Sequence, residues 1–202
     1  MHSLIVVSHP NRASLTHAIG TEVAEAIRAA HSGNSAEIAD LSAEGFDPRF
    51  SLSDVETINR IAKPPASILA EQARIDRADT LVLVYPVYWW SMPALLKGWI
   101  DRVFSAGWAY DESPDGKLEK KLQRLGVHLI AIGAADAGTY AKHGYSGAMK
   151  TQIDHGIFDY CGARILSSHL LTVPDATEAP TALRAARQIG ERIGNPALCD
   201  AA

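Results

Sequence analysis

Two short runs of residues constrain this chain most strongly, because they are apolar at nearly every position rather than at alternate ones. Residues 4–7 read Leu-Ile-Val-Val, and residues 80–85 form a second run of this kind. Strands that are covered on both faces have this pattern, whereas a strand with one solvated face alternates. We therefore expect both segments to lie inside a parallel sheet with helices on both faces.

Segments with helical spacing separate the expected strands. Leu15, Ile19, Val23 and Ile27 follow one another at intervals of four, and Ser14 before them suits an N-cap. We expect further helices at 68–77, 94–104, 149–160 and 181–193, and further strands at 37–41, 126–132 and 163–173. This alternation predicts an α/β fold, a doubly wound five-stranded parallel sheet in one domain over residues 1–202.

Composition narrows the classes of function. The net charge of −4 gives no electrostatic reason to expect nucleic acid as a partner. No segment approaches the roughly 20 apolar residues that a membrane span needs. Cys161 and Cys199 lie far apart, which favours free thiols in a reducing compartment, and we expect a cytoplasmic protein. The histidines are scattered without ligand spacing, so no metal is expected.

The segment at residues 8–16, here the first loop, joins a strand to a helix N-terminus. Backbone N–H groups and the helix dipole attract an anion at such a place. Hydroxyl, imidazole and guanidinium groups in the loop add donors for phosphate oxygens. Neither G-x-G-x-x-G nor the P-loop pattern occurs, so a dinucleotide-type turn and a nucleoside triphosphatase are not supported. A capped helix behind a polar loop is the alternative interpretation.

The second loop, residues 85–93, is the most informative part of the sequence. Four aromatic residues lie within six positions at the end of a strand, where polar turn residues are usual. Exposed apolar surface of this kind marks a binding site for something flat and apolar, and two prolines stiffen the loop. The alternative is that Trp89 and Trp90 are core or dimer-interface residues.

The third loop, residues 133–147, is rich in small residues that allow the backbone to approach a ligand closely. Tyr140, His143, Tyr145 and Ser146 add hydrogen-bond donors within the same stretch. All three loops follow strands, so they should meet at one edge of the sheet, where ligands of such folds bind.

Together these loops resemble the NAD(P)H:quinone oxidoreductase (DT-diaphorase) family, whose fold is flavodoxin-like. Residues 86–104, P-V-Y-W-W-S-M-P-A-L-L-K-G-W-I-D-R-V-F, carry most of the resemblance, and residues 107–110 and 156–162 extend it. His9, Ser14 and Ala18 match the first loop of the family, whereas Tyr140, Gly144 and Gly147 match its third. The resemblance is weakest over residues 42–68.

The resemblance implies a tightly bound FAD, with FMN as the alternative, and ping-pong electron transfer from NAD(P)H to a quinone-like acceptor. It also implies a homodimer with active sites at the interface. Carried over to this sequence, the flavin-binding residues are His9, Asn11, Ser14, Leu15, Thr16, Pro86, Val87, Tyr88, Trp89, Trp90, Gly133, Ala134 and Tyr140. Arg184 would reach a second phosphate, as in FAD-binding relatives.

The catalytic residues implied by the resemblance are Tyr140, His143 and Ser146. Tyr140 would stabilise negative charge at N1/O2 of the flavin. Ser146 stands where eukaryotic relatives have a histidine, so either His143 or water would deliver the proton. The paired glycines of the family's third loop are replaced by Ala134 and Ala135.

Three rival functions remain open. Residues 144–148 nearly match the G-x-S-x-G elbow of serine hydrolases, with Asp159 and His169 following, although no strand directly precedes them. Some relatives serve as ancillary subunits that regulate a potassium-efflux system. Azo or nitro compounds could also replace quinones, because the same reduced flavin serves all three.

Overall fold

The computed structural model describes residues 1–195 and has a parallel five-stranded sheet at its centre. The strands are β1 (His2–Val7), β2 (Ser35–Asp40), β3 (Thr80–Pro86), β6 (Gly126–Gly133) and β7 (Arg164–Thr172), in the order β2-β1-β3-β6-β7. The predicted doubly wound sheet is confirmed, with strand boundaries within two residues of those expected. The residues in the middle of β1 and β3 are fully buried, as continuous apolar runs require.

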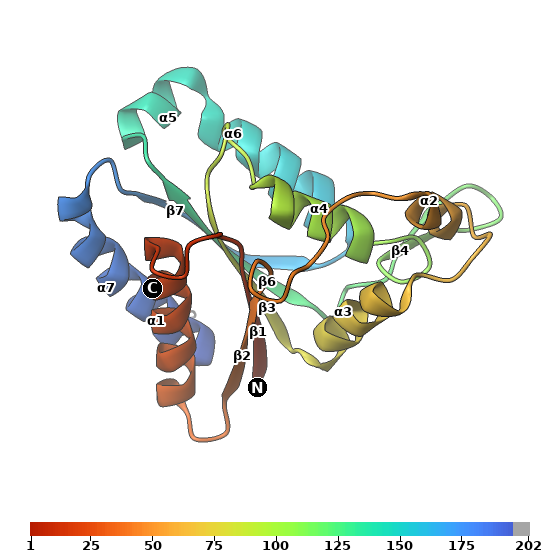
Figure 1. The fold of residues 1–202 in the computed structure, drawn as a ribbon, viewed down its shortest axis with the longest axis horizontal. Coiled ribbons are helices and arrows are strands. Elements are labelled where there is room, and N and C mark those ends of the chain that lie inside the picture. Colours follow the sequence, from red (N-terminus) through yellow and green to blue (C-terminus); the bar gives the residue numbers. More distant parts are fainter. Residues whose placement is uncertain (196–202) are drawn as a thin grey trace.

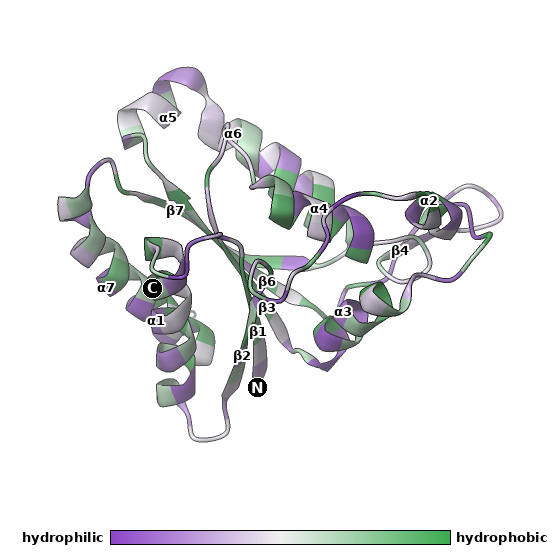
Figure 2. Cartoon of the chain, viewed as in Figure 1, coloured by the Kyte–Doolittle hydropathy of each residue, from purple (hydrophilic) through white to green (hydrophobic). Residues whose placement is uncertain are grey.

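Helices cover both faces of this sheet (Figure 1). The helices α1 (Leu15–Ala30) and α7 (Ala179–Gly194) pack side by side on one face. The other face carries α3 (Ala66–Arg77), α4 (Ala94–Val103) and η1 (Lys150–Asp159). Along α1, α4 and α7 hydrophobic and hydrophilic residues alternate, as in helices that cover a sheet on one side (Figure 2).

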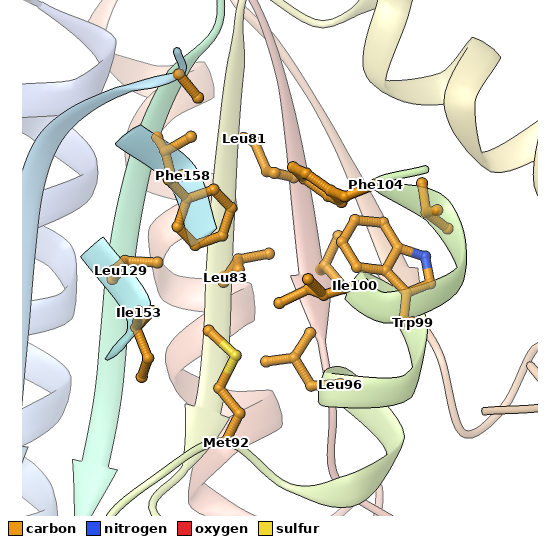
Figure 3. Packing of buried hydrophobic residues seen from close by; sticks show 14 of the residues in the cluster. Leu81, Leu83, Met92, Leu96, Trp99, Ile100, Phe104, Leu129, Ile153 and Phe158 are labelled. Atoms are coloured by element: carbon orange, nitrogen blue, oxygen red, sulfur yellow. The ribbon is translucent and has the colours of Figure 1, made fainter. Parts of the chain in front are cut away.

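The face under α4 and η1 holds the larger core. Trp99 and Phe104 pack against Phe158 and the strand residues Leu81 and Leu83 (Figure 3). Met92, at the end of the second loop, is buried in the same cluster. The second loop is therefore anchored at its far end, and its aromatic tip has a fixed base.

The segment expected to be an ordinary helix at 149–160 is instead the π-helix η1. Its wider turn places Ile153 and Phe158, five residues apart, on the same buried side. An α-helix would bring residues three or four apart together, so the spacing of these two large side chains favours the wider form. The predicted helix at 149–160 is confirmed, and the structure shows that most of it is π-helical.

Short elements complete the structure, and several were not predicted. The third loop contains α5 (Ala137–His143) and α6 (Tyr145–Met149). A small hairpin of β4 (Tyr110–Glu112) and β5 (Leu118–Lys120) follows α4, and α2 (Leu52–Ile58) lies in the weakly patterned segment before α3. The 3-10 turn η2 (Ala176–Glu178) leads into α7. Elements this short have too few residues to show a periodic pattern.

The structure tests the predictions on cysteines and membrane spans only in part. Cys161 is a free, buried cysteine as expected, whereas Cys199 lies outside the described residues. Burial raises the pKa of the Cys161 thiol to about 11, so the thiol stays protonated and unreactive near neutral pH. No helix within residues 1–195 has the length and apolar character needed to cross a membrane.

Candidate flavin site

The three loops meet at the carboxyl-terminal edge of the sheet. The first follows β1, the second follows β3 and the third follows β6, and these three strands are neighbours. The Val87 amide donates to the Ile132 carbonyl at 2.8 Å, which ties the second loop to the start of the third. The strand order reverses between β1 and β3, and ligands of open α/β sheets bind at such a point.

The first loop presents a capped helix N-terminus. Ser14 is the N-cap of α1, as predicted, and its Oγ accepts from the His17 amide at 3.4 Å. Asn11 Oδ1 accepts from the Ala13 amide at 2.9 Å, and the Asn11 amide lies 3.0 Å from Nδ1 of His9. These bonds fix the loop from within and leave the start of α1 free to receive an anion.

Two polar side chains near the first loop make at most one hydrogen bond within the described residues. Ser8 is 1% exposed, and its Oγ has no hydrogen-bond partner among the described residues. Arg184 is exposed on α7, next to Leu183, which lines an open hollow of about 360 Å³ together with Arg12 and Ser14. The guanidinium of Arg184 contacts only its neighbour Thr181 within the described chain, at 2.9 Å.

The second loop contains a tight two-residue turn whose backbone is unusual. Tyr88 and Ser91 exchange backbone hydrogen bonds of 3.0 and 3.1 Å, and between them Trp89 and Trp90 have φ values of 49° and 60°. Large side chains rarely adopt positive φ, and such strain clusters at functional sites. Within residues 1–195 the N–H groups of Trp89 and Trp90 have no backbone partner, so both are free to bind the edge of a ring.

The two tryptophan side chains of this turn differ in surroundings. The Trp89 indole is 92% exposed. Trp90 is half-buried and stacks on Tyr145 with a ring-centroid separation of 3.7 Å and an interplanar angle of 11°. The interpretation of both as core residues is therefore wrong for Trp89, whereas Trp90 packs against the edge of the larger core and stacks on the third loop.

Tyr140 lies against the end of β6. It is 2% exposed, and a methyl group added at Gly133 would lie 2.4 Å from its hydroxyl oxygen. Gly133 thus leaves the space that Tyr140 fills. Burial raises the pKa of Tyr140, so its hydroxyl remains a hydrogen-bond donor at physiological pH.

These features fit the two ends of a flavin. The helix N-terminus, Ser8 and the first-loop donors suit phosphate, whereas the free turn amides, the aromatic loop and the Tyr140 hydroxyl suit a planar ring with polar edges. No group of three or more His, Cys, Asp or Glu side chains in the described chain is placed to hold a metal ion.

Comparisons with known proteins agree with this geometry. A family model described as a flavodoxin-like fold matches residues 1–193. NAD(P)H dehydrogenase (quinone) 1 of Rattus norvegicus is 30% identical over 201 residues, which cover 86% of this chain and 71% of the rat protein. This chain belongs to the flavodoxin-like NAD(P)H quinone dehydrogenase family.

Solved structures of the same family superpose closely. The NAD(P)H:quinone oxidoreductase of Methanothermobacter marburgensis has a TM-score of 0.86 at 25% identity, and the match covers 96% of each chain. A putative quinone reductase of Klebsiella pneumoniae has a TM-score of 0.84 at 25% identity, over 96% of this chain and 83% of that one.

Three other third-loop residues that were expected from the family pattern are exposed to solvent. His143 ends α5, Ser146 lies in α6, and Ala134 follows β6; all three are exposed. Ser146 therefore follows a helix rather than a strand, so the serine-hydrolase elbow is not formed. The two alanines are accommodated, with Ala134 exposed and Ala135 half-buried.

Two features of this family member were missed by sequence reasoning. Tyr145 was noted as a donor, but its stacking on Trp90 joins residues 55 positions apart, and no local pattern signals it. Asp154 is 8% exposed, lines a cavity of about 200 Å³ beside Ser146 and Met149, and has an unpartnered Oδ2. Burial raises the pKa of Asp154. The sequence gives one indication of this buried residue, which is that an acidic side chain stands next to Ile153 in a helix that packs on the sheet.

Proposed function

We propose that this chain is a flavin-dependent enzyme that transfers two electrons from NAD(P)H to quinones in a ping-pong reaction. The proposal rests on one observation: three features meet at the same edge of the sheet. They are the N-terminus of α1, the strained aromatic turn with its two free amides, and the buried hydroxyl of Tyr140. A flavin joins phosphate to a planar ring with hydrogen-bonding edges, which matches this combination of groups.

The first loop would hold the phosphate end. We assign this role to the N-terminal amides of α1 at Leu15 and Thr16 and to the polar groups of His9, Asn11 and Ser14. FAD is the proposed flavin, with FMN as the alternative. Support for FAD comes from Arg184, which is exposed beside the hollow that Arg12 and Ser14 line and hydrogen-bonds only to Thr181 within the described chain.

The second and third loops would hold the ring. Pro86, Val87 and Tyr88 would support the ring, Trp89 and Trp90 would bind its edge through their amides, and Gly133 and Ala134 would line its other side. When bound, the flavin supplies the hydride chemistry. Tyr140 would donate a hydrogen bond to the side of the ring that gains negative charge, and its raised pKa keeps the proton on the phenol oxygen.

Quinone reduction also consumes one proton beyond the hydride, and this proton must come from the solvent. Reduction to a hydroquinone adds two electrons and two protons, one of which arrives with the hydride. His143 is exposed at the end of α5 and is our proposed group for proton exchange. Ser146 is the second candidate, acting through a bound water, because a serine hydroxyl does not itself release a proton near neutral pH.

We further propose that the chain acts as a homodimer in the cytoplasm and that it forms one domain. The family pattern supports the dimer, and the compact sheet with helices on both faces supports the single domain. Quinones are the proposed acceptors, and azo or nitro compounds are the alternative class for the same reduced flavin.

The first test is an absorption spectrum of the purified protein after reconstitution with FAD and, separately, with FMN. We expect one flavin to be retained after desalting, its visible band to bleach under anaerobic NAD(P)H, and the band to return on adding a quinone. Retention of neither flavin would refute the proposed function, whereas bleaching without recovery by quinone would refute the acceptor class.

A further inference from the structure

Three aromatic rings from the second and third loops are stacked one after another. Trp90 stacks on Tyr145 at 3.7 Å and 11°, and the imidazole of His143 lies against the same tyrosine at 5.3 Å and 23°. Tyr140 meets the Trp90 ring edge-on at 5.3 Å. Tyr145 therefore occupies a face of the Trp90 indole, close to the tyrosine assigned to the flavin ring.

The two ends of this stack are half-buried alike, but Trp90 lies in a hydrogen-bonded turn, whereas Tyr145 begins a short helix. Trp90 belongs to the strained turn that Tyr88 and Ser91 close with two backbone bonds. Tyr145 begins the five-residue helix α6, directly after Gly144, whose φ of 70° separates α5 from α6. The Tyr145 side chain is half-buried. A ring that arrives at Trp90 would therefore displace Tyr145 rather than the indole.

We propose that Tyr145 is a specificity-determining residue that competes with planar acceptors for the stacking face of Trp90. This proposal rests on the proposed function. A quinone with fused rings can bind that face only by replacing the phenol ring, so each planar acceptor loses the Tyr145–Trp90 contact when it binds. Acceptors without a flat face cannot stack on the indole, so Tyr145 does not compete with them.

The inference makes a directional prediction that a packing role does not make. Removal of the ring should make binding of planar acceptors tighter, although the substitution deletes contacts from the site. A residue that only supports the fold would weaken binding when truncated. Stacking contributes enough that we expect the KM of a planar quinone to fall about 3- to 10-fold.

The kinetic test uses the flavin-loaded enzyme and two acceptors, anthraquinone-2-sulfonate and ferricyanide. In Tyr145→Ala, the ratio of KM for the quinone to KM for ferricyanide should fall about 3- to 10-fold. Tyr145→Phe keeps the ring and should retain the wild-type ratio, while Tyr145→Ser also removes the ring and should resemble the alanine variant. An unchanged or higher ratio in both truncated variants overturns the proposal.

The second measurement does not depend on turnover. Isothermal titration with anthraquinone-2-sulfonate in the absence of NAD(P)H should give a dissociation constant that is lower in Tyr145→Ala than in the wild type by the same factor. Because no electron transfer is needed, this result stands even if the quinone reductase activity is absent. Equal dissociation constants, or no binding to either protein, would refute the role of Tyr145 on its own.

Discussion

Gly133 and Tyr140 share a small volume at the end of β6. The methyl group of Gly133→Ala would lie 2.4 Å from the Tyr140 hydroxyl oxygen, so the ring must move away. If Tyr140 donates to the reduced flavin, both Gly133→Ala and Tyr140→Phe should slow flavin reduction by NAD(P)H, by roughly 10- to 100-fold for one hydrogen bond to a charged group. Stopped-flow reduction measures this rate.

Gly147→Ala is the matched control for this pair, because an added methyl there has no neighbour within 4 Å. Its reduction rate should stay close to that of the wild type. If Gly133→Ala also reduces flavin at the normal rate, the assignment of Tyr140 to the ring is wrong.

His128 makes the folded protein sensitive to acid. It is buried on β6 with Nδ1 2.7 Å from Ser167 Oγ, and burial together with nearby His169 lowers the pKa of His128 to about 4. The unfolded chain takes up a proton below its ordinary pKa near 6.5, whereas the folded chain does so only near 4. Stability should therefore fall as the pH drops from about 6.5 to 4, by about 2–3 kcal/mol from this residue.

Urea unfolding at a series of pH values checks this prediction. In His128→Asn the fall in unfolding free energy between pH 6.5 and 4 should become smaller, since asparagine does not titrate. The exposed His31 offers a control, and His31→Gln should retain the wild-type slope. The same slope in His128→Asn and the wild type would contradict a buried neutral histidine.

At the scale of elements, α1 and α7 approach one another through small residues. A methyl group added at Gly190 would lie 2.7 Å from both Ala26 Cβ and the Val23 carbonyl. Gly190→Ala should therefore push the helices apart and lower the free energy of unfolding by about 1–3 kcal/mol, despite the better helix propensity of alanine. Chemical denaturation measures the change, and Gln188→Ala, on the exposed side of α7, should be nearly neutral. A more stable Gly190→Ala would show that the helix pair can relax.

At the scale of the whole molecule, the side around α2 carries exposed apolar residues that a monomer would leave in water. Leu52 is 73% exposed and Ile61 is 74% exposed, and Phe50, Val55 and Leu69 are exposed near them in the sequence. Patches of this kind mark interaction sites. If the chain forms the proposed homodimer, we expect its interface to cover this surface.

Sedimentation velocity tests this assignment. The sedimentation of the wild-type protein should correspond to twice the chain mass of 21.7 kDa. The double substitution Leu52→Asp with Ile61→Asp should shift the equilibrium toward the monomer. Lys63→Glu, a charge change in the same segment, serves as the control. A monomeric wild type would remove the dimer, and a dimeric double variant would place its interface elsewhere.

The layered α/β fold and the three site loops could be predicted from local sequence patterns alone. Continuous apolar runs such as residues 4–7 specify buried parallel strands, and intervals of four, as in Leu15 and Ile19, specify covering helices. The Ser14 cap is a local contact within one turn, so it was also predictable. These features depend on neighbours in the chain, which is why one sequence suffices to see them.

The assembly of the site could not be predicted in this way, because it depends on contacts between distant segments. The stack of Trp90 on Tyr145, the fit of Tyr140 over Gly133 and the burial of Asp154 all depend on how β3 and β6 bring separate loops together. The π-helical period of η1 likewise follows from packing Ile153 and Phe158 into one core. Local propensity gives a residue its element, whereas contacts between distant segments set the direction of its side chain and hence its chemistry.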